Sequence, residues 1–182
     1  MSKMRIIAGE AKGRKLFSPA GIGLRPTSDK VREALFNILA FQIAGTSFLD
    51  LYAGSGAVGI EAMSRGAQKV VFVEKDRAHI TLLKKNLSLF QNHHDVEIFE
   101  GTALHFLKIN KNQFDIIFID PPYAEGAEEI LQTVGGCDII PPRGIAIIEH
   151  FHKTNLPDTV GGLSLLKRYR YGGTTLTSYV KN

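Results

Sequence analysis

The stretch that decides the fold is DLYAGSGAVG, residues 50–59. It ends one apolar, strand-like run and opens a helix-like run. Gly54, Gly56 and Gly59 give the pattern G-x-G-x-x-G. Glycines at this spacing let the backbone turn tightly and approach a ligand closely. The stretch therefore predicts a strand–loop–helix unit that holds a cofactor.

Strand-like and helix-like runs alternate along the chain from about residue 46. This alternation predicts βαβ units, a mostly parallel sheet and helices on both of its faces. The last two strand-like runs meet at Gly172-Gly173 without a helix between them, so we expect them to pair as a hairpin. The expected strands are 47–52, 69–74, 96–99, 114–119, 145–149, 163–171 and 175–180, and the expected helices are 57–65, 77–90, 103–109 and 127–134.

Upstream of this unit, residues 5–9 and 14–17 are short strand-like runs that predict a small basic hairpin. Residues 19–26 contain several Gly and Pro signals and are expected to form a loop. Thr27 or Ser28 then caps a helix that carries an apolar stripe. We therefore divide the chain into a basic N-terminal hairpin or arm, residues 1–26, and a second domain, residues 27–182.

The composition is that of an ordinary soluble protein, with 44% hydrophobic and 22% charged residues among 182. No apolar run approaches the roughly 20 residues of a membrane span, and no secretory signal follows the first residues. Cys137 is the only cysteine, which excludes an internal disulfide and suggests a reducing compartment, the cytoplasm. The six histidines show no metal-ligand grouping, so we expect no metal.

Charge is distributed unevenly along the chain. The overall net charge is +4, but residues 1–32 carry eight Lys or Arg against two acids, and residues 159–182 carry four Lys or Arg and no acid. The remaining middle of the chain is acidic. Basic ends on an acidic middle suggest a polyanionic partner that touches the ends, with a solvated basic surface as the alternative.

A second acid strengthens the cofactor prediction. Glu74 lies 20 residues after Gly54, at the end of the next expected strand, where a carboxylate can accept hydrogen bonds from ribose hydroxyls. The loop and the acid together indicate an adenosine cofactor, either a dinucleotide or S-adenosylmethionine. Asp50 favours S-adenosylmethionine, because a carboxylate four residues before Gly54 would repel a pyrophosphate but suits an ammonium group.

The run Asp120-Pro121-Pro122-Tyr123 follows the expected buried strand 114–119. Proline has no N–H, so the strand should stop there, at the edge of the sheet where ligands bind. Asp120 and the Pro121 carbonyl could each accept a hydrogen bond from one exocyclic amino group, which would turn its lone pair toward an incoming methyl group. Tyr123 could stack on the base. The alternative is a strand end with a Pro-Pro stop and a solvated Asp.

Taken together, these residues resemble the RsmD-type bacterial 16S ribosomal RNA guanine-N2 methyltransferases, nearly from end to end. The most specific matches are residues 5–9 with 13–16 and residues 24–27 with 29–33. The glycine loop and the Asp-Pro-Pro-Tyr run also occur in many other amino-methyltransferases, including those that act on DNA. Further matches are residues 35–37, 49–50 with 53–56, 61–62 with 64–67, 74–76 and 120–123.

The resemblance implies a Rossmann-like, seven-stranded class I methyltransferase fold, α/β, with its last strand antiparallel and a small N-terminal β-hairpin extension. It implies S-adenosylmethionine as donor and the N2 of one guanine of 16S rRNA as target, with the small ribosomal subunit or its assembly intermediate as partner and a monomeric enzyme. The implied catalytic residues are Asp120, Pro121, Pro122 and Tyr123. The implied cofactor-binding residues are Asp50, Tyr52, Ala53, Gly54, Ser55, Gly56, Glu74, Lys75, Thr102 and Ala103. Thr102 stands where such enzymes often carry an Asp that faces the adenine amino group.

The basic N-terminal segment supplies the candidates for contact with the RNA backbone. They are Arg5, Arg14, Lys15, Arg25, Lys30 and Arg32. A DNA adenine or cytosine amino-methyltransferase stays the main alternative, since it shares every pocket residue and differs only in the N-terminal blocks. A non-enzymatic adenosine-binding or RNA-binding module and a nicotinamide oxidoreductase are further alternatives, against which the Asp-Pro-Pro-Tyr run argues.

Overall fold

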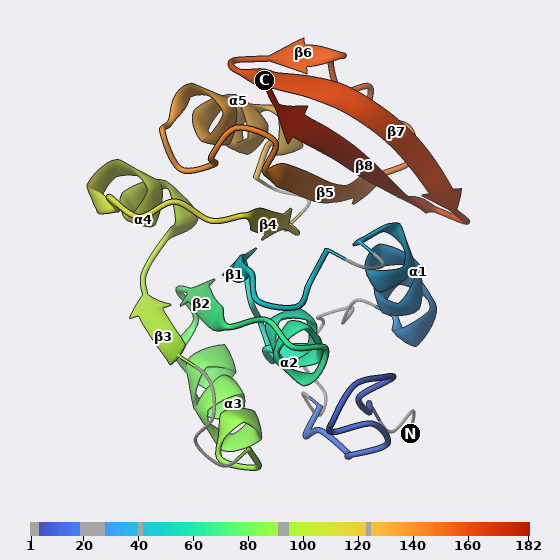
Figure 1. Ribbon diagram of the computed structural model, residues 1–182, viewed down its shortest axis with the longest axis vertical. Coiled ribbons are helices and arrows are strands. Elements are labelled where there is room, and N and C mark those ends of the chain that lie inside the picture. Colours follow the sequence, from blue (N-terminus) through green and yellow to red (C-terminus); the bar gives the residue numbers. More distant parts are fainter. Residues whose placement is uncertain (1–3, 19–27, 40–41, 91–94, 123–124) are drawn as a thin grey trace.

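The computed structural model describes residues 4–18, 28–39, 42–90, 95–122 and 125–182. It shows one eight-stranded sheet flanked by helices (Figure 1). The helices are α1 (Asp29–Leu39), α2 (Ala57–Ser64), α3 (Arg77–Leu87), α4 (Ala103–Ile109) and α5 (Ala127–Gly136). The strands are β1 (Ser47–Leu51), β2 (Lys69–Glu74), β3 (Asp95–Glu100), β4 (Ile116–Ile119), β5 (Ile145–Phe151), β6 (Thr159–Val160), β7 (Leu163–Tyr171) and β8 (Thr174–Lys181).

The strands lie in the order β3-β2-β1-β4-β5-β8-β7-β6. The first five strands are parallel to one another, and β8 lies between β5 and β7, antiparallel to both. The order runs one way from β1 to β3 and the other way from β4 onward, so a topological switch point lies between β1 and β4. In such sheets a crevice for ligands opens outside the carboxyl ends of the strands at this point. The predicted α/β, Rossmann-like class is confirmed.

Helices cover both faces of the central part of the sheet, which explains why β1, β2 and β4 are mostly apolar and buried. One core cluster joins Phe48, Phe72 and Phe118 of the sheet to α1, α2 and α3, and a second joins Leu49 and Ile119 to α4 and α5. Successive strand residues thus alternate between the two clusters, as the pleat requires. Figure 1 shows α4 and α5 on one side of the sheet and α1, α2 and α3 on the other.

The glycine loop owes its shape to two different constraints. Gly54 and Gly56 have φ angles of 55° and 80°, a region that side chains with a Cβ rarely adopt. Gly59 has no such angle, but a Cβ added to it would lie 2.2 Å from the ring of Phe72. The first two glycines therefore shape the turn, and the third lets α2 pack directly on β2.

The structure differs from the predicted elements in several places, mostly at element ends; α3, for example, ends at Leu87 instead of residue 90. The sheet has eight strands instead of seven, because β6 pairs two residues with β7; a two-residue strand is too short to show alternation in sequence. β4 begins at Ile116, two residues later than expected. The hairpin within residues 4–18, here called the N-terminal arm, pairs through one bridge between Arg5 and Lys15 and through neighbouring backbone hydrogen bonds.

The hairpin of β7 and β8 around Gly172 is confirmed. In the described part of the chain, none of the helices has the length and apolar character needed to cross a membrane.

Candidate active site

A cavity of about 330 Å³ opens at the carboxyl ends of β1, β2, β4 and β5, at the switch point of the sheet. Asp120, Pro121 and Pro122 line it, whereas Tyr123 lies outside the described residues. Every predicted cofactor-binding residue also lines the cavity except Gly56, which belongs to the glycine loop but does not face the cavity. Residues that the sequence reasoning missed complete the lining: Ser28, Val31, His79, Phe118, Glu125, Glu149, His150 and Thr174 are among them.

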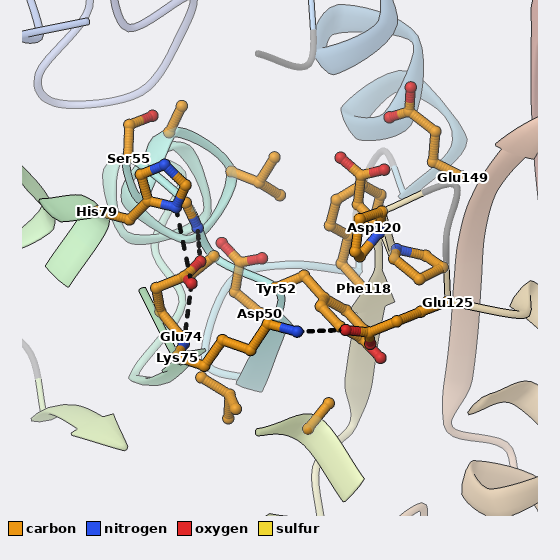
Figure 2. Close-up of a pocket in the computed structure, with 18 of the residues that line it drawn as sticks. Asp50, Tyr52, Ser55, Glu74, Lys75, His79, Phe118, Asp120, Glu125 and Glu149 are labelled. Carbon is orange, nitrogen blue, oxygen red and sulfur yellow. Dashed lines mark hydrogen bonds and ion pairs between the residues drawn. The ribbon is translucent and has the colours of Figure 1, made fainter. Parts of the chain in front are cut away.

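Four acids from four adjacent parallel strands meet in this cavity. Glu74 ends β2 and Asp120 directly follows β4, while Asp50 and Glu149 lie one and two residues before the ends of β1 and β5. Each follows, by two positions, an apolar residue of the core cluster that contains α1 and α2. Because alternate strand residues share a face, the four side chains point to the same side of the sheet. Figure 2 shows Glu74 at one end of the cavity and Asp120 with Glu149 at the other.

Glu74 ties the glycine loop to the turn after β2. Its Oε2 accepts a hydrogen bond from the Gly54 N–H at 2.8 Å, and its Oε1 accepts from the N–H groups of Lys75 and Asp76, both at 2.8 Å. A carboxylate oxygen can accept two hydrogen bonds, so Oε2 can take one more from a ligand hydroxyl. The Glu74 carboxylate is therefore placed to accept a hydrogen bond from a ribose hydroxyl.

Asp50 is buried under the loop and accepts a hydrogen bond from the Gly59 N–H at 2.9 Å. Burial raises the pKa of Asp50 to about 8, and the nearby acids Asp120 and Glu74 add to the effect while the Gly59 hydrogen bond opposes it. The Asp50 carboxyl lies against the N–H groups of the first turn of α2, which is where a dinucleotide would place its pyrophosphate. The residues present therefore fit S-adenosylmethionine, whose ammonium group would favour the ionised carboxylate, and do not fit a dinucleotide.

An ion pair spans the cavity near Asp50. The Lys75 ammonium lies 2.5 Å from Oε1 of Glu125, and the Tyr52 hydroxyl also donates to Glu125. Burial and this hydrogen bond raise the pKa of Tyr52, which holds a strained φ of 72°. Although burial favours the neutral acid, the two donors keep the pKa of Glu125 below its usual value. The pair joins the turn after β2 to the segment that leads into α5 (Figure 2).

Thr102 stands where related enzymes often carry an Asp that faces the adenine. It lines the cavity and caps α4. Its Oγ1 accepts a hydrogen bond from the His105 N–H at 3.2 Å. A hydroxyl that accepts this bond can still donate its own hydrogen. Thr102 can therefore serve both the helix and a ligand.

The predicted RNA-contacting residues divide into different groups. Arg5, Lys15 and Lys30 are exposed, and Arg25 lies outside the described residues. Arg14 is also exposed, but its guanidinium donates to the Leu89 carbonyl and lies over the ring of Phe90, so it also holds the arm in place. The prediction is wrong for Arg32, whose side chain is buried.

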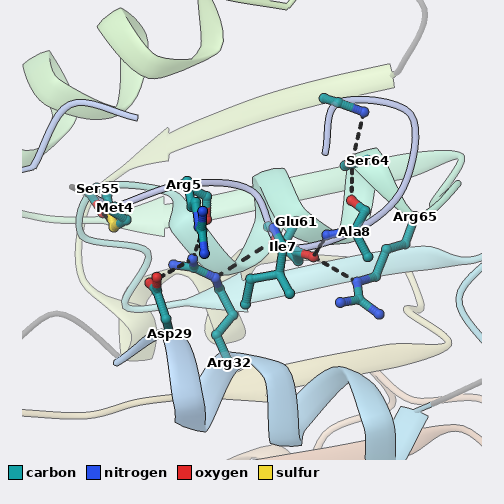
Figure 3. A network of polar contacts seen from close by, with 12 residues as sticks. Met4, Arg5, Ile7, Ala8, Asp29, Arg32, Ser55, Glu61, Ser64 and Arg65 are labelled. Carbon is teal, nitrogen blue, oxygen red and sulfur yellow. Dashed lines mark hydrogen bonds and ion pairs between the residues drawn. The ribbon is translucent and has the colours of Figure 1, made fainter. Parts of the chain in front are cut away.

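The Arg32 side chain is fully buried and cannot reach an RNA backbone. It donates to the Arg5 carbonyl at 2.5 Å and to Oδ1 of Asp29 at 3.0 Å, and its Nε lies 3.8 Å from Oε2 of Glu61 (Figure 3). Burial lowers the pKa of Arg32, and the two acids partly restore it. An Arg in a basic helix start normally faces solvent, and no local pattern reveals that a distant acid on α2 pairs with this one.

Glu61 of α2 holds the N-terminal arm against the rest of the protein. Its two oxygens accept the N–H groups of Ile7 at 2.8 Å and Ala8 at 2.9 Å, and Arg65 donates its Nε at 2.8 Å (Figure 3). The contact is close: a Cβ added to Gly9 would lie 1.8 Å from the Ser64 carbonyl oxygen. The arm is thus packed directly on α2.

Asn86 of α3 joins the arm to the glycine loop. Its Oδ1 accepts from the Phe17 N–H at 2.8 Å, and its Nδ2 donates to the carbonyls of Phe17 at 3.1 Å and Ser55 at 2.9 Å. The side chain is fully buried. One amide therefore links the end of the arm to the wall of the cavity.

The sheet order, the glycine loop and the acids at the strand ends define the class I, S-adenosylmethionine-dependent methyltransferases. Comparison with solved structures agrees: a putative methyltransferase, yhhF, from Escherichia coli superposes with a TM-score of 0.87 at 36% identity, covering 99% of this chain and 98% of that one. The chain belongs to the family described as Conserved hypothetical protein 95, whose model matches residues 4–180.

Curated relatives are named as ribosomal RNA methyltransferases. Ribosomal RNA small subunit methyltransferase D of Haemophilus influenzae is 40% identical over 151 residues, which is 81% of this chain and 78% of the relative. A putative rRNA methyltransferase of Bacillus subtilis, YlbH, is 37% identical over 182 residues, 98% of this chain and 99% of the relative. The resemblance to RsmD-type enzymes found in the sequence is confirmed.

Replacing Asp50 by Asn should flatten the dependence of stability on pH. The pKa of about 8 exceeds the ordinary value of 3.8, so the folded protein keeps a proton that the unfolded chain releases. The free energy of unfolding should therefore fall as the pH rises from 5 to 7, by roughly 1 kcal/mol per pH unit from this group. Asn has no such proton and can still accept from Gly59.

Urea unfolding at several pH values checks this, with Asp95→Asn at an exposed carboxyl as the matched control. Equal slopes in wild type and Asp50→Asn would mean that the buried carboxyl is ionised in the folded protein.

Removing Glu61 should destabilise the protein strongly. Glu61→Ala leaves the buried Arg32 without its acid on α2 and deprives two N–H groups of the arm of their acceptor. We expect a loss of about 3–5 kcal/mol in the free energy of unfolding. Glu128→Ala, at an exposed site on α5, should change it by less than about 0.5 kcal/mol.

The double variant Arg32→Met/Glu61→Ala separates the contribution of the Arg32–Glu61 ion pair from that of the hydrogen bonds between Glu61 and the arm. If the ion pair matters, the double variant should be more stable than Glu61→Ala alone, as measured by urea unfolding. Strictly additive losses would show that Arg32 and Glu61 do not interact.

Proposed function

We propose that this protein transfers a methyl group from S-adenosylmethionine to the exocyclic N2 of one guanine in small-subunit ribosomal RNA. The observation that carries the proposal is the placement of Asp120 and Pro121 in the same cavity as Asp50 and Glu74. A donor-binding half and an amine-binding half thus share one space. The names of the curated relatives support rRNA of the small subunit as the substrate.

At the donor end, S-adenosylmethionine supplies an electrophilic methyl group on a sulfonium. Glu74 accepts hydrogen bonds from the ribose hydroxyls and Asp50 receives the ammonium group. The glycine loop provides close backbone contact, and Lys75 and Tyr52 form the wall together with Glu125. Thr102 and Ala103 lie at the start of α4, where the adenine would be bound.

At the acceptor end, Asp120 and the Pro121 carbonyl accept the two hydrogens of the amino group. The nitrogen lone pair then leaves conjugation with the ring and points along the line of attack. As the N–CH3 bond forms, the S–CH3 bond breaks and S-adenosylhomocysteine would leave as the neutral thioether. Positive charge grows on nitrogen, the Asp120 carboxylate stabilises it, and the surplus N–H proton is then lost to solvent. Holding the nitrogen close to the methyl carbon and in line with it supplies further acceleration.

The target base must leave its stack to reach this cavity, as in other enzymes that modify bases. In the proposal Tyr123 stacks on the base, with Pro122 beside it. Residues 27–182 form the catalytic domain, and residues 1–26 form an arm that contacts RNA. Arg5, Lys15 and Lys30 contact the RNA backbone, joined by Arg25 and, through its exposed part, Arg14. The substrate is the small subunit or an assembly intermediate.

Asp120→Ala should lower methyl transfer by at least about 100-fold, the usual effect of losing a group that stabilises developing charge. Binding of S-adenosylmethionine, measured by calorimetry, should change little, because the residue lies at the acceptor end. Asp138→Ala, an exposed carboxyl before β5, is the control and should keep full turnover. Retained turnover in Asp120→Ala would refute the mechanism.

The assay should offer labelled donor with unmodified small subunits, naked rRNA and duplex DNA in parallel, and it should identify the product nucleoside. N2-methylguanosine at one rRNA site is the expected product. Methyl transfer into DNA alone would preserve the chemistry of the cavity but overturn the RNA assignment.

Neutralising exposed cations of the arm and of the start of α1 should weaken RNA binding and reduce its salt dependence. In the triple variant Arg5→Gln/Lys15→Gln/Lys30→Gln, the slope of log affinity against log salt should fall in magnitude by about 2–3, because each lost phosphate contact removes less than one unit. Lys108→Gln/Lys111→Gln, on and after α4 at the other face of the sheet, is the control. An unchanged slope in the triple variant, with donor binding intact, would contradict the role of the arm.

A further inference from the structure

Glu149 lies next to the proposed catalytic acid on the neighbouring strand. β4 and β5 are parallel and pair Ile119 with Ile148, so Asp120 and Glu149 are the next residues of the two strands. Neighbouring strands lie about 4.8 Å apart, and the two side chains share a face of the sheet. Both residues line the cavity, and Figure 2 shows both carboxylates at the end of it away from Glu74.

Two acids on neighbouring strands can bind two adjacent hydrogen-bond donors on one edge of a guanine. The Watson–Crick edge of guanine carries the N2 amino group and, on the adjacent ring atom, an N1–H. Adenine and cytosine also present an amino group on this edge, but the ring nitrogen beside it is an acceptor. An ionised carboxylate can only accept hydrogen bonds, so a second carboxylate beside Asp120 favours the base that offers another donor.

His150, the residue after Glu149, also lines the cavity, and both of its ring nitrogens already have hydrogen-bond partners. Its Nδ1 lies 3.0 Å from the Phe151 carbonyl oxygen, which can only accept, so Nδ1 carries the hydrogen. Its Nε2 then accepts from the Thr177 hydroxyl at 2.8 Å. Burial, together with the charge of Arg168, lowers the pKa of His150 and keeps the ring neutral. Glu149, the residue after the register pair Ile119–Ile148, is therefore the group on β5 that we consider as a partner for the base.

We propose that Glu149 is a specificity-determining residue that accepts the N1–H of the target guanine while Asp120 and the Pro121 carbonyl hold N2. The inference rests on the proposed function, since it assumes a guanine in the cavity. Glu149 fixes the base in the orientation that presents N2, and it rejects adenine and cytosine, whose ring nitrogen would place a lone pair against the carboxylate. An amino-methyltransferase that lacked this acid would have no such basis for discrimination.

The test uses two RNA substrates that differ at the target base, guanine or 2-aminopurine. 2-Aminopurine keeps the N2 amino group but has an acceptor at N1. Wild-type enzyme should methylate guanine faster by about 100-fold in kcat/KM, since a site built to bind a donor discriminates strongly against its absence. In Glu149→Gln the guanine rate should fall by about 10- to 100-fold, the effect of losing one charged hydrogen bond. The 2-aminopurine rate should rise, because the amide can donate to N1.

The ratio of the two rates is the readout, so the missing O6 of 2-aminopurine cancels between enzymes. Glu97→Gln, the same change at an exposed site on β3, should leave the ratio unchanged. An unchanged ratio in Glu149→Gln that still binds S-adenosylmethionine would overturn the inference. The wild-type comparison tests it without any variant: equal rates on the two bases would also overturn it. Failure of wild type to methylate guanine at all would instead refute the proposed function.

Discussion

The structure depends on how the buried ends of four parallel strands are made compatible with negative charge. Parallel strands end at the same edge, so Glu74, Asp50, Asp120 and Glu149 converge on one cavity. Burying an unpaired carboxylate is costly, and the chain offsets part of that cost with backbone donors. The Gly54 N–H binds Glu74 and the Gly59 N–H binds Asp50. The same glycine loop that shapes the cavity therefore also stabilises its acids.

A similar arrangement holds the N-terminal arm. Glu61 is buried in α2, yet its oxygens receive N–H groups from the arm and the cation of Arg65, with Arg32 close by. The segment that carries the basic residues is consequently attached through hydrogen bonds to the domain that carries the cavity. Asn86 extends the connection to Ser55 in the glycine loop. The arm and the donor half of the site are parts of one packed unit.

Much of the fold could be predicted from sequence because its signals are local. β2, α4 and β7 have the predicted boundaries, and the alternation of runs gave the parallel sheet with helices on both faces. The cavity residues could be found where a motif marks them, as in residues 50–59 and at Asp120. Arg32 and Glu149 could not, because their roles depend on partners brought close only by the tertiary fold. A cation looks solvated, and an acid at a strand end looks incidental, until the neighbouring element is known.

The opposite charges of the cavity and the arm act together as an electrostatic filter. A phosphate that approached Glu74, Asp120 and Glu149 in the cavity would be repelled, whereas the same phosphate would be attracted by Arg5, Lys15 and Lys30 at the surface. Under the proposed function, a polynucleotide would be favoured with its backbone near these cations and only an uncharged base in the cavity. Because this distinction between phosphate and base depends on charge alone, it would act before any contact specific to the base is made.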